Sequence, residues 1–370
     1  MRMTRRSSTA SAATTSAVPS VEPSSTTMHS SAATLLERTL SSARPMLPAA
    51  FHAGMTTETS GRSTGGSMLR FSAMLQSQSR APRRAVPGLG TPIALLRHAI
   101  DDVVSRRRLI GYLVQAESKK RGSNTLLGNL WWVLDPLLQM TVYVVFITIV
   151  AQRKTPDYPL FIFAAILPFK WYTSTVNDAT QTVVRQERLI KQIAFPKIVL
   201  PVATATADVV GFLWGMIPLL GIMLLYQDHG RLTPLVLLVP VIAVVQYVFT
   251  LASAVLVSAA NVFFRDLGNV ISHVLRLWWF LSPGLYSIQN LKDVELFKEH
   301  PNLISIAHLN PLAILFESYR AVIYGAADGV GPPHLPDFGG LAALLLFSLV
   351  FLALAAMFFK RVEPTFAKVL

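Results

Sequence analysis

Long apolar stretches separated by short polar segments fill most of this 370-residue chain. A transmembrane helix needs about 20 mostly apolar residues, and six stretches approach or exceed that length with few charges. The pattern predicts an all-α integral membrane protein with six transmembrane helices. We place these spans at residues 126–151, 160–176, 200–226, 232–264, 271–288 and 338–359.

Ahead of the first span, apolar residues recur at helical spacing from Pro92 onwards, with Arg97, Asp101 and Asp102 on the opposite side. Pro92 suits the first turn of a helix, where its missing N–H leaves no bond unmade. We predict an N-terminal amphipathic helix over residues 92–122. A basic helix beside a transmembrane span is typical of the membrane interface, and the alternative is a surface helix of a soluble domain.

The connection between the fifth and sixth spans, residues 289–337, is too long for a simple turn. Residues 312–324 are apolar on one side but too short to cross a bilayer, which favours a re-entrant or interfacial helix. Asn310 and Pro311 supply a start signal, with Asn as the N-cap and Pro at the first helical position. We therefore predict short re-entrant helices that dip back from the outer surface.

Residues 1–90 have a different composition, with 29 Ser and Thr and 10 Arg against three acidic residues. Because no apolar period persists there, this segment cannot bury enough surface to offset its chain entropy. We predict a disordered extension. The sequence leaves two alternatives open, a mis-assigned start codon and an organelle transit peptide, which is also rich in Arg and Ser.

Composition supports the membrane assignment, because 52% of the residues are hydrophobic, 14% are charged and the mean hydropathy is +0.46. Soluble proteins carry about 25% charged residues. With the amino end inside, the cytoplasmic segments collect fifteen Lys and Arg against six outside. This asymmetry is typical of cytoplasmic loops beside anionic lipid. We therefore place both termini in the cytoplasm and expect no binding to nucleic acid.

No enzyme motif is present in the sequence. The chain has no Cys, which excludes disulfides and thiolate metal sites. The dipeptide Gly-Lys is absent, so the chain lacks a recognisable phosphate-binding loop of its own. The eight His show no metal-ligand spacing. We expect no catalytic residue, no metal and no cofactor in this chain.

Residues in energetically costly positions are the candidates for function. Asp135 lies within the first expected span, where a carboxylate usually faces a bundle interior or a watery path; the alternative is a position near the headgroups, if the span begins later. Trp131–Trp132 and Trp278–Trp279 form pairs. Such pairs fit either an interfacial aromatic belt or a path whose ring faces slide past the C–H faces of sugars.

The segment RQERLIKQIAFPK, residues 185–197, lies between the second and third spans. A short charged helix with one apolar face fits a groove on another protein. A lipid-contacting basic loop is the alternative, although it would need neither the acidic residue nor the apolar ones. The polar residues are Arg185, Glu187, Arg188 and Lys191, and the apolar residues are Leu189, Ile190 and Ile193.

Six segments in this order resemble the membrane subunits of type-2 ABC exporters that move polysaccharides, such as O-antigen, capsule and teichoic-acid permeases. The segments are GSNTLLGNLWWVLDPLL, YPLFIFAAILPFKWY, RLIKQIAFPKIVLP, NVFFRDLGNV, LWWFLSPGLY and LNPLAILFESYRAVIYG. The resemblance runs from about residue 95 to residue 370 and leaves the first 90 residues outside.

The resemblance implies a six-span permease domain over residues 126–370, paired as a homodimer in a bacterial inner membrane with two ATPase subunits that bind the ATP. It implies that segment 185–197 is a coupling helix docked on the ATPase, and that a lipid-linked glycan is exported. The first and fifth spans would line the path, and the region 289–337 would close it outside. The path candidates are Trp131, Trp132, Asp135, Trp278, Trp279 and Tyr286, and the outer-gate candidates are Asn310, Pro311 and Tyr319.

Asp135 and Lys170 depart from the family pattern, which usually has neutral residues at both positions. Their charges indicate either an unusual substrate or an ion pair between the two. The glycan and its lipid carrier stay open at this point. An ABC permease for small hydrophobic molecules is one alternative function, and a secondary transporter or channel that uses Asp135 or Asp208 without ATP is another.

Overall fold

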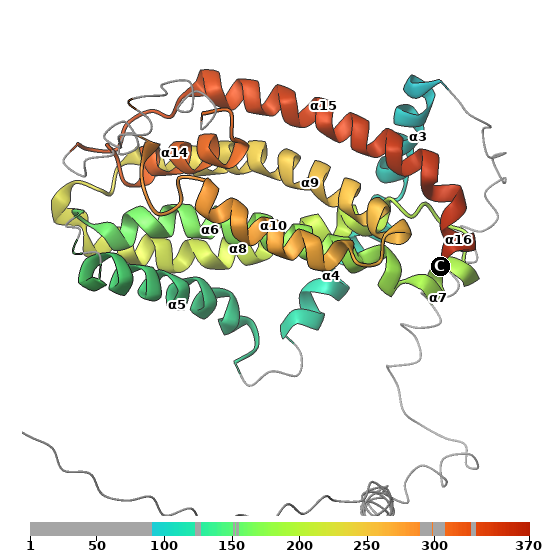
Figure 1. Cartoon of the computed structure of the whole chain (residues 1–370), viewed down its shortest axis with the longest axis horizontal. Helices are drawn as coiled ribbons and strands as arrows, with labels where there is room; N and C mark the ends of the chain where they lie inside the picture. Colours follow the sequence, from blue (N-terminus) through green and yellow to red (C-terminus); the bar gives the residue numbers. More distant parts are fainter. Residues whose placement is uncertain are drawn as a thin grey trace, which may run out of the picture. The chain divides into compact units, whose positions relative to one another are not determined.

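The computed structural model describes residues 91–122, 127–150, 152, 155–288, 298, 308–326 and 331–370. These residues all belong to one compact unit, Pro82–Leu370. Within this described part the regular structure is entirely helical, which confirms the all-α class (Figure 1). The expected extension, residues 1–90, and parts of the region 289–337 lie outside the described residues.

Helices occupy all six expected span positions and run roughly side by side (Figure 1). Two short helices, α7 (Glu187–Gln192) and α16 (Phe366–Val369), lie at one end of this bundle, which we call the α7 end; α14 (Pro311–Ile323) lies at the other, the α14 end. The helices at the span positions are α5 (Trp131–Val145), α6 (Tyr158–Arg185), α8 (Val199–Leu225), α9 (Val239–Phe263), α10 (Leu267–Leu281) and α15 (Phe338–Val362).

Among the described residues, four helical segments are long and apolar enough to cross a membrane: Trp131–Val150, Val199–Leu225, Pro234–Phe263 and Phe338–Val369. They correspond to the first, third, fourth and sixth expected spans. The first continues from α5 through a π-helical turn, Phe146–Val150. The second and fifth expected spans correspond to α6 and α10. These two helices are not among the four apolar segments, each for a different reason.

Helix α6 is the centre of the bundle. At 28 residues it is long enough to cross a bilayer. It is not among the four apolar segments because its composition, which includes Lys170, is less hydrophobic. It packs against α5, α8, α9, α10 and α14, and most of its side chains are buried. Polar groups inside a membrane protein are tolerated where they face other helices rather than lipid. The low hydropathy of α6 therefore follows from its central position.

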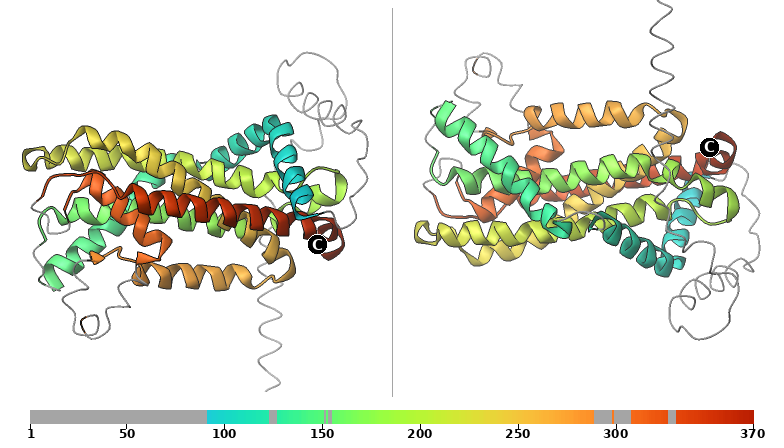
Figure 2. Two further views of the ribbon diagram at one scale, coloured as in Figure 1. Left: turned by 90° about the horizontal axis from the view of Figure 1, so that it is seen from above. Right: turned by 90° about the horizontal axis from the view of Figure 1, so that it is seen from below.

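Helix α10 lies along one edge of the bundle in both views of Figure 2. It has 15 residues, which corresponds to about 22 Å at 1.5 Å per residue and is less than the roughly 30 Å of a bilayer core. It ends where Ser282 adopts an extended backbone immediately before Pro283, as expected of a residue that precedes proline. The helix therefore stops well short of residue 288, the expected boundary.

The expected amphipathic helix, residues 92–122, is two helices that meet at Arg106. The first, α3 (Pro92–Ser105), packs on α15, whereas the second, α4 (Arg107–Gly122), packs on α8. Because the two halves contact different helices, a break between them is required. Pro92 lies in the first turn of α3, as the sequence predicts.

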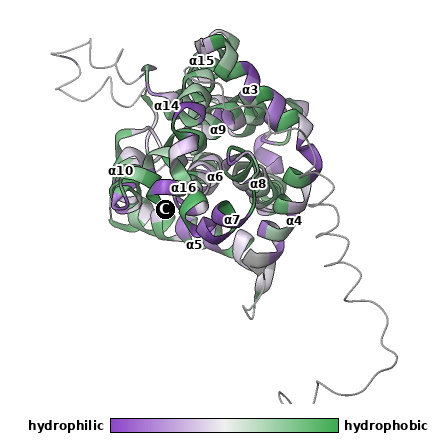
Figure 3. Ribbon diagram, turned by 90° about the vertical axis from the view of Figure 1, so that its right-hand side faces the viewer, coloured by the Kyte–Doolittle hydropathy of each residue, from purple (hydrophilic) through white to green (hydrophobic). Residues whose placement is uncertain are grey.

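Buried apolar side chains form two clusters. The larger one joins α6, α8, α9 and α14. The smaller one, the α7-end cluster, gathers Ala99 of α3, Ile190 of α7, Phe359 of α15 and Phe366 of α16. Seen from this end, hydrophilic residues appear on α3, α4 and α7 around the apolar cluster (Figure 3). The α7 end thus has a small core of its own.

Candidate functional site

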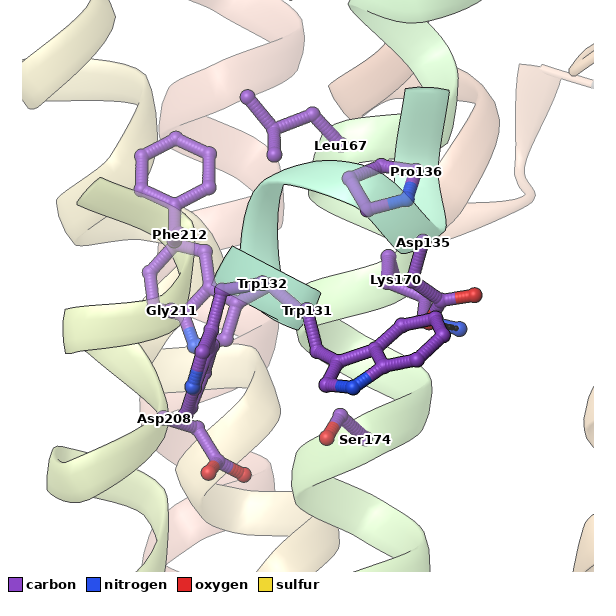
Figure 4. A pocket seen from close by; sticks show the side chains of 11 residues that line it. Trp131, Trp132, Asp135, Pro136, Leu167, Lys170, Ser174, Asp208, Gly211 and Phe212 are labelled. Atoms are coloured by element: carbon purple, nitrogen blue, oxygen red, sulfur yellow. Dashed lines mark ion pairs between the residues drawn. The ribbon is translucent and has the colours of Figure 1, made fainter. Parts of the chain in front are cut away.

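A cavity of about 250 Å³ lies between α5, α6 and α8 (Figure 4). Helix α5 contributes Trp131, Trp132 and Asp135 from its first two turns, so three of the candidate path residues meet in one place. The other helices add residues that the sequence analysis did not single out as path residues. The cavity is lined by Trp131, Trp132, Asp135, Pro136, Leu167, Lys170, Trp171, Ser174, Asp208, Gly211 and Phe212.

Two oppositely charged residues of the lining form an ion pair on this cavity. Lys170 Nζ of α6 lies 2.5 Å from Asp135 Oδ2 of α5, and both side chains are about half exposed. An unpaired charge at this position in a membrane protein would raise the free energy of the folded protein, whereas pairing with an opposite charge reduces this penalty. Of the two explanations that the sequence left open, the ion pair is therefore the one observed.

The opposite wall of the cavity belongs to α8. Asp208 is 1% exposed and points into the space below Trp132 (Figure 4). The indole of Trp132 lies directly on Gly211, where an added Cβ would be 1.5 Å from Cζ3 of the indole. Only glycine at position 211 therefore allows Trp132 its observed place. Sequence spacing gives no signal for this contact, because it joins two helices.

The other path candidates lie apart from this cavity, beside α14. Trp279 is 2% exposed and packs against Tyr143, Phe169 and Phe316, with ring centroids 5.7, 4.7 and 5.8 Å away. Trp278 is half-buried and meets Tyr172 edge-on. Within a single chain, these two indoles therefore hold α5, α6, α10 and α14 together. Whether they also line a path stays a prediction.

The start of α14 is built as the sequence predicts. The Asn310 side chain accepts a hydrogen bond from the Leu312 N–H at 3.1 Å, and Pro311 occupies the first turn. The same Asn310 carboxamide accepts from Trp278 Nε1 at 3.1 Å and donates to Ser282 Oγ at 2.8 Å. Asn310 thus caps one helix and fastens it to the end of α10. Tyr319 lies further along α14 and is buried, 6.2 Å from the ring of Phe212.

Arg320 of α14, one of the six Lys and Arg expected outside, is buried and holds the segment after α10. Arg320 of α14 donates to the carbonyl oxygens of Pro283 at 2.5 Å and Tyr286 at 3.1 Å, and also to that of Gly284. Its guanidinium lies 3.7 Å from the ring centroid of Phe161. Tyr286, a path candidate, is therefore positioned through its backbone by α14.

A second buried arginine fastens the start of α6. Arg231 Nε donates to Asp157 Oδ2 at 2.9 Å, and its Nη1 donates to the carbonyl oxygens of Tyr324 at 2.5 Å and Gly331 at 3.0 Å. Asp157 has a left-handed backbone with φ of 48°. The α14 end is thus held by two arginines whose partners are mainly backbone carbonyls distant in sequence.

At the opposite end, the expected coupling segment 185–197 is helical only over α7, because Arg185 is the last residue of α6 and Ile193 has an extended backbone. Arg185, Arg188 and Lys191 are exposed, and Lys191 Nζ lies 2.6 Å from Glu187 Oε1. The hydrogen bond and charge of Lys191 hold the pKa of Glu187 below its usual range, so this carboxylate is ionised at neutral pH.

The apolar side of α7 is divided between the bundle and the surface. Ile190 is 5% exposed and packs in the α7-end cluster, so it is not available at the surface as the docking prediction required. Leu189 and Ile193 are half-buried. Any docking surface on α7 therefore consists mainly of its polar residues.

A charge cluster missed by the sequence analysis connects α7 to the rest of the α7 end. Lys360 of α15 bonds to Asp102 of α3 and, at 2.6 Å, to Oε2 of Glu363. The other oxygen of Glu363 accepts from the backbone N–H of Lys197, in the segment between α7 and α8, at 2.6 Å. We call Asp102, Lys360 and Glu363 the Lys360 cluster. Lys360 and Glu363 are only three residues apart, but their bonds to Asp102 and Lys197 cannot be read from the sequence because these residues are distant along the chain.

Comparison with known proteins assigns the class. The family model of the ABC-2 type transporter matches residues 108–324, from α4 to the end of α14. This match spans more than half of the chain and includes both the cavity and α7. The chain therefore belongs to the ABC-2 type transporter family, and it is a multi-pass membrane protein.

Individual relatives carry a narrower name. The chain is 33% identical over 270 residues to the O-antigen export system permease protein RfbA of Myxococcus xanthus, which covers 73% of this chain and 98% of that protein. It is 26% identical over 212 residues to a protein of the same name from Klebsiella pneumoniae, covering 57% of this chain and 78% of that protein.

Proposed function

We propose that this chain is the membrane permease subunit of an ABC exporter that moves a lipid-linked polysaccharide across the bacterial inner membrane. The observation that carries the proposal is the similarity to the Myxococcus xanthus O-antigen permease, which extends over 98% of that protein at 33% identity. A likeness over a whole subunit favours a shared role for that subunit, rather than one shared motif.

A separate ATPase supplies the energy in this proposal, since the chain has no phosphate-binding loop in its sequence. The α7 end lies in the cytoplasm, and the chain docks on the ATPase through Glu187, Arg188 and Lys191 of α7 and through Arg185 at the end of α6. The support is the exposure of the basic side chains and the ordered Glu187–Lys191 pair. The chain works as a homodimer, in which α5 and the edge helix α10 line the path between two copies.

The test exchanges charges on α7. The variant Glu187→Lys with Arg188→Glu keeps the net charge and reverses the local pattern. In cells that make the polysaccharide, we expect it to insert into the membrane, to lose about tenfold or more of the co-purifying ATPase, and to lose export. Such a loss follows because misplaced charges at an interface cost a few kcal/mol. Arg361→Glu, on an exposed residue of α15, is the control.

Two results would contradict the proposal. Retention of the ATPase by the charge-exchanged variant would show that α7 is not the docking element. Transport of a solute by the chain alone, reconstituted in vesicles with only an ion gradient, would instead identify a secondary transporter and remove the need for an ATPase.

A further inference from the structure

The cavity between α5, α6 and α8 has the size and lining of a site for one part of a larger ligand. We propose that it is a subsite, contained within a single copy of the chain, for one uncharged sugar ring of the exported polymer. This inference rests on the proposed export function and adds to it a location and a charge preference.

The volume sets the size of the occupant. Pockets for whole drug-sized ligands measure about 300–1,000 Å³, and this cavity measures about 250 Å³. It therefore suits a single ring and not an extended chain. The half-exposed side chains of Lys170 and Asp135 lie at its opening, so the rest of a polymer can remain outside.

Aromatic rings from all three helices form the walls. Trp131 and Trp132 come from α5, Trp171 from α6 and Phe212 from α8, with the rings of Trp171 and Phe212 4.6 Å apart. The face of an aromatic ring is electron-rich, and the axial C–H groups of a sugar ring present slightly positive hydrogen atoms. Such walls bind the flat face of a sugar by stacking, and they bind a charged phosphate poorly.

The polar groups match hydroxyls and disfavour anions. The cavity is lined by the carboxyl groups of Asp135 and Asp208, the ammonium of Lys170 and the hydroxyl of Ser174. Sugar hydroxyls both donate and accept hydrogen bonds, so they find acceptors on the carboxylates and donors on Lys170 and Ser174. A phosphate or uronate would meet no net positive charge, because the ammonium of Lys170 is already paired with Asp135, and the anion would compete with Asp135 for it.

Gly211 offers a way to alter the aromatic wall without touching a polar group. In Gly211→Ala the new methyl group would displace the Trp132 indole, because a Cβ at this position would lie only 1.5 Å from Cζ3 of the ring. Gly221 lies on the same helix and has nothing within 4 Å of the corresponding position. Gly221→Ala is therefore a matched control that makes the same chemical change in open space.

The experiment uses the full chain with its ATPase in lipid nanodiscs. Binding of a panel of methyl glycosides of neutral hexoses and deoxyhexoses is followed by saturation-transfer NMR, with inorganic pyrophosphate as the anionic probe. We expect transfer to the ring C–H protons of at least one glycoside, with about tenfold weaker binding in Gly211→Ala and unchanged binding in Gly221→Ala. Pyrophosphate should not compete.

A second variant covers the case in which Gly211→Ala does not fold. Trp131 is 46% exposed, so Trp131→Leu removes a wall and leaves the bundle intact; it too should weaken glycoside binding. Three results would each contradict the subsite. The first is that no glycoside binds, the second is that glycosides bind equally to the wild type and both wall variants, and the third is that pyrophosphate displaces the glycoside. Polysaccharide export by the wild-type protein, measured in parallel, shows whether the proposed function itself stands.

Discussion

At the scale of single residues, the buried arginines of the α14 end hold distant backbone segments in place by hydrogen bonds to their carbonyl oxygens. Arg320 bonds to three carbonyls in the segment after α10 and to the Phe161 carbonyl of α6 at 3.3 Å. Hydrogen bonds from a charged donor contribute about 1.5–3 kcal/mol each, and a buried carbonyl that loses its donor is costly. Arg320 therefore determines where the segment that contains Tyr286 lies.

Replacing Arg320 tests this role. We expect Arg320→Met to lower the apparent Tm of the purified protein by roughly 10 °C, because about 3–5 kcal/mol is lost when several carbonyls lose their donor. Arg320→Lys should recover only part of this, since one ammonium cannot reproduce the fork of a guanidinium. Thermal unfolding in detergent measures the Tm of each variant, and Arg276→Met, at an exposed position, is the control. The same Tm in all variants would contradict a stabilising role for Arg320.

At the scale of elements, the Lys360 cluster joins three parts of the α7 end that belong to different segments. Its bonds connect α3, the end of α15 and the turn that follows α7. Beside it, Phe366 of α16 packs edge-on against Phe359 of α15 at 5.3 Å, and α16 also contacts α7. A displacement of α7 must therefore be transmitted to α15 and α3, unless these contacts break.

Removal of the central ammonium should release α3. In Lys360→Met, the carboxylates of Asp102 and Glu363 lose their common cation, and loss of one partner from a buried pair costs about 3–5 kcal/mol. We expect trypsin to cut at the arginines 106–108 several-fold faster, because cleavage follows local opening. Lys368→Met changes an exposed lysine of α16 and should leave the rate unchanged. Identical digestion of Lys360→Met and wild type would contradict the connection.

At the scale of the whole molecule, the helices and the family match both lie in the later part of the chain. The described helices lie within the compact unit Pro82–Leu370. In addition, the Myxococcus xanthus relative is covered over 98% of its length by 270 residues, which leaves the rest of this chain unmatched. The match to the family model begins at residue 108, so the part of the chain that identifies the family does not include the first residues.

Deletion of residues 1–81 should accordingly leave export within about twofold of the full-length protein, because none of the helices that form the cavity, α7 or the Lys360 cluster is removed. The measurement is cell-surface polysaccharide, normalised to the amount of permease in the membrane. A loss of export at equal protein level would assign the segment a function of its own.

The sequence by itself determined the helical class, the positions of the helices at five of the expected spans and the cap of α14, whereas the fifth helix, α10, ends earlier than expected. These features depend on local properties, namely apolar length, proline and the Asn310–Pro311 pair, so they can be read along the chain. Hydropathy also gave correct positions for the four lipid-compatible helices. The family followed from six local segments that occur in order.

The tertiary structure alone decided which polar residues meet. The sequence offered an ion pair between Asp135 and Lys170 only as one of two alternatives. Nothing in the sequence placed Gly211 beneath Trp132 or Glu363 beside Lys197. The tertiary structure also turned Ile190 inward and put the least apolar long helix, α6, at the centre. Each of these depends on packing between distant segments, whereas hydropathy records only how a residue would interact with lipid or water.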